Sequence, residues 1–256
     1  EIVIRDVYNK EDVAFSELDR KFITAFERYL KETRGLVRNT AAKYLECFRK
    51  VLKVAQQKGW MEHGKFLEEL GELCVKEETY PSFLDWDELR TVMETDMPAG
   101  RLERVKDVFV FCALTGLSYQ GISTLCPSHL FRDDEGTLWI CRTRAEGAEV
   151  GDSCTSRVPL LKPAMVLLEK YRGWNPMNPE GLCFPVPSVQ KMNEYLKEVS
   201  VLCRISKRLT TQMARNTFAA IVTLTNRIPK EHVREMLGYS SDYMLRHYMQ
   251  AQERNS

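Results

Sequence analysis

Two side chains near the C-terminal end, Arg215 and Tyr248, are of types suited to chemistry on a phosphodiester. An arginine guanidinium donates two parallel hydrogen bonds to phosphate oxygens and keeps its proton at working pH. A tyrosine hydroxyl has an ordinary pKa of about 10, so it attacks only where a cation or a base favours its ionised form. Attack would give a pentacoordinate phosphorus, whose extra negative charge an arginine stabilises. Tyr248 taken alone is typical of a half-buried helical tyrosine. Its assignment as a nucleophile therefore depends on its sequence spacing from Arg215.

Other site chemistries are not indicated. The eight cysteines show no C-x-x-C spacing, and we expect reduced core thiols, several of them in apolar helical runs. The four histidines are not spaced as metal ligands, and the thirteen glycines form neither a G-x-G-x-x-G nor a G-K-S/T loop. No stretch approaches the roughly 20 apolar residues that a membrane span needs. The sequence therefore predicts no metal site and no membrane span.

The elements that must position Arg215 and Tyr248 are mainly helices. Upstream of them, an apolar helix expected over 103–115 is ended by Gly116. The segments LWICRTR and SRVPL are short and rich in β-forming residues, and a turn is expected at FRDDEG, so a minor antiparallel sheet is predicted. After Pro159 the apolar periodicity predicts helices over 163–172, 188–203, 210–226, 229–237 and 241–250.

The N-terminal part is predicted to be a small helical module. Asp19 resembles a helix cap, Gly35 ends the first helix, and Asn39 or Thr40 caps the second. One or two short helices are expected between residues 61 and 73. The stretch CVKEETYPSFL lacks helical periodicity, and the D-x-x-E pattern of DWDEL predicts a new helix start. We therefore expect a helical domain over 1–76, a linker over 77–84 and a second domain over 85–256.

Charge is distributed unevenly although the formal net charge is only +1. Residues 20–58 hold eleven Lys and Arg against three Glu, which gives +8, and residues 200–256 hold nine against four acids, which gives +5. Residues 62–78 between them carry six Glu and two Lys, which gives −4. Two basic blocks around an acidic one favour a chain that binds a polyanion from two sides. Many helical proteins also segregate charge without binding a polyanion, so charge alone does not decide the function.

The stretch 209–250 resembles the C-terminal signature of tyrosine recombinases. In that family a helix carries His-x-x-Arg followed by His-Thr-Phe-Ala, a Pro-started helix ends in Leu-Gly-His, and the nucleophilic tyrosine follows. Here the R-x-T-F-A core at 215–219, Ile228-Pro229, Met236-Leu237-Gly238 and Tyr248 fall in register. The blocks LTGLSYQGISTL, LWICRTRAEG and RVPLL match further family blocks in order and spacing. FPVPSVQKMNEYLKEV is similar to a helix of integrases from Bacteroides-type mobile elements.

The chain departs from the family pattern at several positions. The first family arginine is replaced by Ser118, for which a helix cap is the plain alternative, and Arg144 matches the arginine of Bacteroides-type relatives. The hairpin lysine aligns best with Glu146, a charge reversal, and with Ala145 if the turn is shifted by one residue. Gln212 replaces the histidine of His-x-x-Arg and cannot carry a proton, whereas Tyr239 replaces the histidine after Leu-Gly and keeps a donor hydroxyl.

The resemblance implies a mostly α chain with a small antiparallel sheet (α+β), built from a helical core-binding domain and a recombinase catalytic domain. Its implied function is cutting and rejoining duplex DNA through a 3′-phosphotyrosine to integrate or excise a mobile element, without metal or other cofactor. The alternative is a catalytically degenerate DNA-binding accessory protein. Expected partners are duplex DNA and further copies of the chain on that DNA, in a bacterial cytoplasm and nucleoid. The expected catalytic residues are Tyr248, Arg215, Arg144, Gln212 and Tyr239, and the expected DNA contacts are Lys43, Arg49, Lys50 and Lys53.

Overall fold

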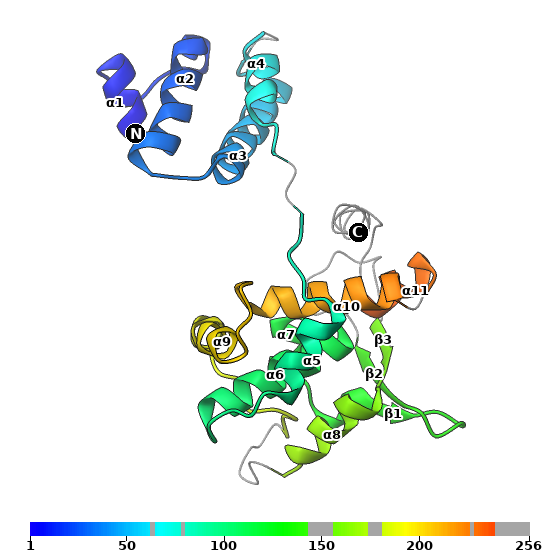
Figure 1. Cartoon of the computed structure of the whole chain (residues 1–256). Helices are drawn as coiled ribbons and strands as arrows, with labels where there is room; N and C mark the ends of the chain where they lie inside the picture. Colours follow the sequence, from blue (N-terminus) through cyan, green and yellow to red (C-terminus); the bar gives the residue numbers. More distant parts are fainter. Residues whose placement is uncertain (62–64, 78–79, 143–155, 174–180, 226–227, 239–256) are drawn as a thin grey trace. The chain divides into compact units, whose positions relative to one another are not determined.

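Figure 1 shows a computed structural model of the chain, which describes residues 1–61, 65–77, 80–142, 156–173, 181–225 and 228–238. The chain divides into two compact units, Glu1–Thr79 and Tyr80–Ser256. Both are built mainly from helices, and the sheet of the described residues belongs to the second unit. No helix within these ranges is long and apolar enough to cross a membrane.

The first unit is a helical bundle whose core is formed by apolar residues of α2, α3 and α4, among them Ile23, Leu45 and Leu70. Asp19 caps α2 as predicted, because its carboxylate accepts the backbone N–H of Phe22 at 3.1 Å. The elements are α1 (Ile2–Tyr8), the 3-10 turn η1 (Phe15–Glu17), α2 (Arg20–Arg28), the π-helical turn η2 (Tyr29–Thr33), α3 (Arg38–Gln57) and α4 (Lys65–Leu73).

The capping of α3 differs from the prediction. The helix begins at Arg38 with Val37 as its N-cap, so neither Asn39 nor Thr40 caps it. The amide of Asn39 instead holds the backbone of Glu77, donating to its carbonyl at 3.0 Å and accepting its N–H at 2.8 Å. A long-range backbone partner has thus taken the side chain that local pattern assigned to the cap.

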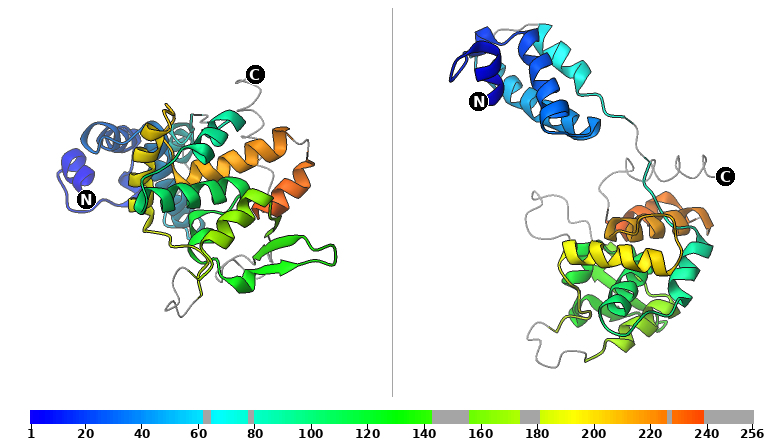
Figure 2. Two further views of the ribbon diagram at one scale, coloured as in Figure 1. Left: turned by 60° about the horizontal axis from the view of Figure 1, so that its bottom comes forward. Right: turned by 60° about the vertical axis from the view of Figure 1, so that its left-hand side comes forward.

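The second unit is packed around α6 (Arg101–Thr115). From Val108 to Thr115 every side chain is at most 5% exposed, and Figures 1 and 2 show other helices on several sides of α6. Gly116 ends the helix in the left-handed conformation, as predicted. The helices packed against α6 are α5 (Trp86–Glu94), α8 (Lys162–Lys170), α9 (Val189–Leu202) and α10 (Thr211–Thr225), and α11 (Lys230–Leu237) packs on α10.

The sheet is antiparallel with strand order β1-β2-β3. Ile140, which is 1% exposed, lies in the central strand opposite Leu130 on one side and Val158 on the other. Asp133 stabilises the turn between β1 and β2 by accepting the indole N–H of Trp139 at 2.7 Å. The strands are β1 (Leu130–Arg132), β2 (Leu138–Arg142) and β3 (Ser156–Pro159).

The predicted fold class, a mostly α chain with a small antiparallel sheet, is confirmed. The capping box at the start of α5 is also confirmed, since Asp85 accepts from the N–H of Glu88 at 2.8 Å and the Glu88 carboxylate accepts from the N–H of Asp85 at 2.9 Å.

Strand β1 and the short helix α7 (Tyr119–Ser123) were not expected, because neither is long enough to show a periodic pattern. The helix expected over 241–250 lies outside the described residues.

Candidate functional site

Arg215 of α10 lies where the C-terminal ends of two other helices meet. It projects from α10, is half-buried, and its guanidinium donates to the carbonyl of Gly116 at the end of α6 and to the carbonyl of Leu237 at the end of α11. The last carbonyls of a helix carry partial negative charge, so a cation is favoured there. The arginine is therefore fixed in place by backbone groups of two other elements.

Gly116 makes this arrangement possible. Its φ is +71°, a conformation that costs side chains with a Cβ, and a Cβ added there would lie 2.5 Å from a ring carbon of Phe218. The ring of Phe218, which follows Arg215 by one turn of α10, thus packs directly on the backbone whose carbonyl holds the arginine. Thr115-Gly116 of one sequence block and Arg215-x-x-Phe218 of another therefore pack together at this contact.

Gln212 and Asn216 lie along the same helix as Arg215. The exposed amide of Gln212 donates to the amide oxygen of Asn216 at 3.0 Å, and Asn216 donates to the backbone carbonyl of Ser82, also at 3.0 Å. The next residue, Thr217, accepts the backbone N–H of Leu84 at 3.0 Å through its hydroxyl. The segment 82–84, at the end of the predicted linker, is therefore bound to the helix that carries Arg215. Asn216 was not predicted from sequence, since nothing local marks its distant backbone partner.

Ser118 and Arg142 form hydrogen bonds to backbone groups of α7. The Ser118 hydroxyl accepts the N–H of Gly121 at 3.1 Å, so the helix-cap interpretation of this residue is confirmed. Arg142, the last residue of β2, donates to the carbonyl of Gly121 and, at 2.7 Å, to the hydroxyl of Thr124. Burial lowers the pKa of the Arg142 guanidinium. Both side chains serve the local structure between α6 and the sheet.

The four basic residues expected to bind DNA do not share one environment. Lys43, Lys50 and Lys53 are exposed on α3. Arg49 is half-buried and packs on α4, where a Cβ at Gly71 would lie 3.0 Å from its Cζ. Its Nε is buried and has no hydrogen-bond partner among the described residues. The structure therefore separates Arg49, placed between two helices, from three lysines that face solvent.

Comparisons with known proteins decide the fold. Residues 4–70 match the family model of the phage integrase SAM-like domain. The chain resembles the Tn1549 transposon integrase in complex with a circular intermediate DNA, with TM-score 0.72, 13% identity and coverage of 100% of this chain and 92% of that one. It also resembles the XerH site-specific recombinase bound to a difH substrate, with TM-score 0.71, 15% identity and coverage of 99% and 75%. The chain has the tyrosine recombinase fold.

A lambda integrase dimer bound to a core site shares this recombinase fold, with TM-score 0.67, 15% identity and coverage of 96% of this chain and 85% of that one. A comparison with curated protein sequences finds no match. The recognition of a tyrosine recombinase and phage-integrase relationship from the sequence blocks is therefore confirmed at the level of fold. The finer kinship with Bacteroides-type integrases stays a prediction.

Within the recombinase fold, the described part of the site contains Arg215, Gln212 and the backbone around Ser118. Gly238, in the left-handed conformation at +62°, ends α11 beside the carbonyl that accepts from Arg215. Tyr239 follows directly in sequence. Tyr239, Tyr248, Arg144 and Glu146 all lie outside the described residues. The phosphate-binding role of Arg215, like the nucleophile and the hairpin residue, is a prediction from sequence.

Proposed function

We infer that this protein is a site-specific tyrosine recombinase or integrase that cuts and rejoins duplex DNA for the integration or excision of a mobile element. The observation that carries the proposal is the position of Arg215, held by the ends of α6 and α11 in a recombinase fold. Solved proteins of the same fold are bound to DNA, among them the Tn1549 integrase and XerH. A bacterial host and a Bacteroides-type element belong to this proposal.

In the proposed reaction the Tyr248 hydroxyl loses its proton, its oxygen forms a bond to phosphorus and the bond to the 5′-oxygen breaks. The departing 5′-oxygen takes a proton from a group that replaces the family lysine, which leaves a 3′-phosphotyrosine and a free 5′-hydroxyl. Arg215 and Arg144 bind the non-bridging oxygens, while Gln212 and Tyr239 position the phosphate. Attack by a 5′-hydroxyl on the phosphotyrosine reverses the step. The energy of the broken bond is kept in the new one, so neither a metal nor an external cofactor is required.

The domain assignment is part of the same proposal. Residues 1–76 act as the core-binding domain, 77–84 as the linker and 85–256 as the catalytic domain. The basic blocks at 20–58 and 200–256 supply the phosphate contacts of the two parts, so both bind the same duplex. We expect a monomer in free solution and further copies of the chain bound only on DNA.

A second candidate function is a DNA-binding accessory protein that has lost cleavage. Two observations favour it. Ser118 is used as a helix cap and offers no cation, and Gln212 bonds to Asn216 and cannot exchange a proton. Loss of one preorganised donor costs on the order of 10²–10³ in rate, so several substitutions together would leave binding without detectable cleavage.

Covalent trapping separates the two functions. The chain is incubated with a nicked suicide duplex carrying the ends of its element, and protein–DNA adducts are resolved on a denaturing gel. The recombinase function predicts an adduct that Tyr248→Phe and Arg215→Ala abolish while both variants still bind the duplex. Binding without an adduct, at any protein concentration, would support the accessory protein instead.

A further inference from the structure

A groove with a volume of about 520 Å³ lies between α6, α9 and the segment 182–187. Small-molecule sites have volumes of this order. The groove is at the N-terminal end of α6, whereas the carbonyl that holds Arg215 belongs to Gly116, just past the other end. Helix α6 has 15 residues, and at 1.5 Å per residue its two ends are about 22 Å apart. The groove is therefore separate from the site around Arg215.

The charged side chains that line this groove are all cationic. Arg101 and Arg104 reach it from α6 and Lys191 from α9, and no carboxylate belongs to its described lining. Arg101 lies over the ring of Tyr195 at 5.1 Å and pairs with Glu198 at 3.2 Å, but both partners of that pair are more than 40% exposed, so it neutralises the arginine weakly. The start of α6 adds the positive end of its helix dipole.

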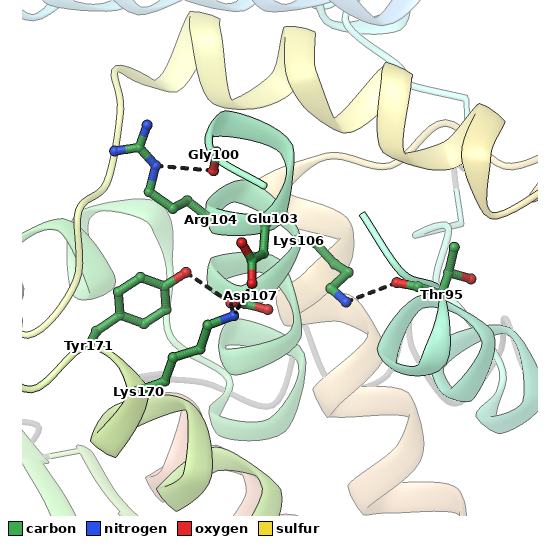
Figure 3. Close-up of polar contacts among 8 residues, drawn as sticks. All are labelled: Thr95, Gly100, Glu103, Arg104, Lys106, Asp107, Lys170 and Tyr171. Atoms are coloured by element: carbon green, nitrogen blue, oxygen red, sulfur yellow. Dashed lines mark hydrogen bonds and ion pairs between the residues drawn. The ribbon is translucent and has the colours of Figure 1, made fainter. Parts of the chain in front are cut away.

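Arg104 is directed toward the groove and away from the acidic side chains of its own helix (Figure 3). Its Nε donates to the carbonyl of Gly100 at 3.2 Å, and its two terminal nitrogens donate to no group within the described ranges. The nearby carboxylates are already occupied: Lys170 binds Glu103 and Asp107 at 2.6 Å each, and the hydroxyl of Tyr171 donates to Asp107 at 2.8 Å. The carboxylates of α6 therefore do not neutralise the cations of the groove.

The wall opposite the cations is apolar. The half-exposed side chains of Pro185, Val186 and Pro187 form it, and the two prolines have no N–H to donate. A ligand that matches both walls has an apolar flat body and a compact group with more than one negative charge. A sugar-phosphate backbone would meet the cations alone, since duplex DNA buries its base faces in the stack.

We propose that this groove is a binding site for a small phosphorylated ligand with an aromatic body, of the nucleoside diphosphate class. The phosphate groups contact Arg104 and Lys191, and the planar base lies against Val186 and Pro187 of the apolar wall. The site does not depend on the proposed DNA chemistry. It would let the chain respond to a soluble nucleotide at a surface remote from Arg215.

The test is isothermal titration of the full chain with ADP, and with adenosine and inorganic pyrophosphate as the two halves of the ligand. We expect ADP to bind at least about tenfold more tightly than either half, because each wall contributes to affinity. Arg104→Glu and Lys191→Glu should each weaken ADP binding by about tenfold or more, since a charge-assisted contact becomes a repulsion. The matched control Arg90→Glu makes the same charge change on exposed α5 and should leave binding unchanged.

Three results would overturn the proposal. ADP that does not bind, or that binds equally to Arg104→Glu and wild type, would show that the groove does not take this ligand. Pyrophosphate that binds as tightly as ADP would show an inorganic anion only. ADP displaced by duplex DNA, or lost in Arg215→Ala but kept in Lys191→Glu, would place binding in the DNA site. Unchanged duplex binding by Lys191→Glu keeps this test distinct from that of the recombinase function.

Discussion

The hydroxyl of Thr217 accepts a hydrogen bond from the backbone N–H of Leu84 at 3.0 Å, with both residues completely buried. Thr217 lies two residues after Arg215 on α10, and Asn216 between them binds the carbonyl of Ser82. The chain that leads into the second unit and the arginine that would bind the scissile phosphate are therefore attached to the same turn of one helix. Movement of the segment 82–84 would therefore displace that turn of α10.

Thr217→Val tests this attachment. The change preserves shape but leaves the buried N–H of Leu84 without an acceptor, so we expect the free energy of unfolding to fall by about 1–3 kcal/mol. The matched control is Thr91→Val on the exposed face of α5. The Thr91 hydroxyl bonds within its own helix, so this change should alter the free energy of unfolding by less than about 0.5 kcal/mol. Equal losses in urea unfolding of the two variants would show that the Leu84 bond contributes nothing specific.

Gly116→Ala should be more damaging than Gly136→Ala. Both glycines have positive φ, +71° and +82°, so both alanines carry the same kind of backbone cost, about 1–2 kcal/mol. Only at Gly116 does the new Cβ meet a side chain, since nothing lies within 4 Å at Gly136. Crowding against Phe218 should add about 1–3 kcal/mol. Thermal unfolding of the two variants measures the difference, and identical losses would contradict the close packing of α6 on α10.

The bonds of Asp107 to Tyr171 and Lys170 should make stability fall in alkaline solution. Burial and the hydrogen bond to Asp107 raise the pKa of Tyr171 above its ordinary value of 10.0. Burial opposes the charge of Lys170, but its bonds to Asp107 and Glu103 outweigh this and raise its pKa. A raised pKa gives stability that is complete below the unfolded value and is lost above it.

Tyr171→Phe isolates the tyrosine part of this effect. Urea unfolding should show the variant less stable than wild type at pH 8. The gap should narrow above about pH 10, because the tyrosine hydroxyl then ionises in the unfolded chain while the folded state keeps it protonated. A gap that stays constant up to pH 11 would mean that Tyr171 does not titrate against Asp107.

The exposed lysines of α3 should contribute to DNA affinity. Lys43→Glu and Lys50→Glu are expected to weaken duplex binding and to reduce the slope of log K against log salt by about 0.9 for each phosphate that the variant no longer neutralises. Lys10→Glu makes the same charge change at another exposed site of the first unit and serves as the control. Fluorescence anisotropy over a salt series measures both quantities. Slopes that match wild type in Lys43→Glu and Lys50→Glu would remove α3 from the DNA-binding surface.

Local sequence rules identified the parts of the fold that local contacts determine. The caps at Asp19 and Asp85 and the helix end at Gly116 follow from residues within one turn of each other. Asn39 failed as a cap because its partner, the backbone of Glu77, is distant in sequence. Arg49 is one of the four predicted DNA contacts, and its packing against Gly71, which sets it apart from the three exposed lysines, follows only from the folded structure. Such long-range partners leave no local pattern.

In the candidate site, too, sequence identifies individual residues but not the long-range contacts between them. Arg215 and Ser118 are both identified by their register with family blocks, and the helix cap was the alternative interpretation of Ser118. The bonds of Arg215 to Gly116 and Leu237 depend on two helix ends that meet α10 only in the folded chain. The role of Glu146 also depends on tertiary position, because a carboxylate matters to the chemistry only if the hairpin faces the phosphate.

The yield of Tyr248-linked adduct in Glu146→Lys tests the recombinase account most directly. At an effective dielectric near 20, a carboxylate a few ångströms from a phosphate repels it by about 4 kcal/mol, and lysine would restore attraction and an acid for the leaving 5′-oxygen. Wild-type cleavage should therefore be slow. Glu146→Lys should raise the adduct on a suicide duplex, Gln212→His added to it should raise it further, and Tyr248→Phe should abolish it. No adduct in any variant that still binds the duplex would contradict the account.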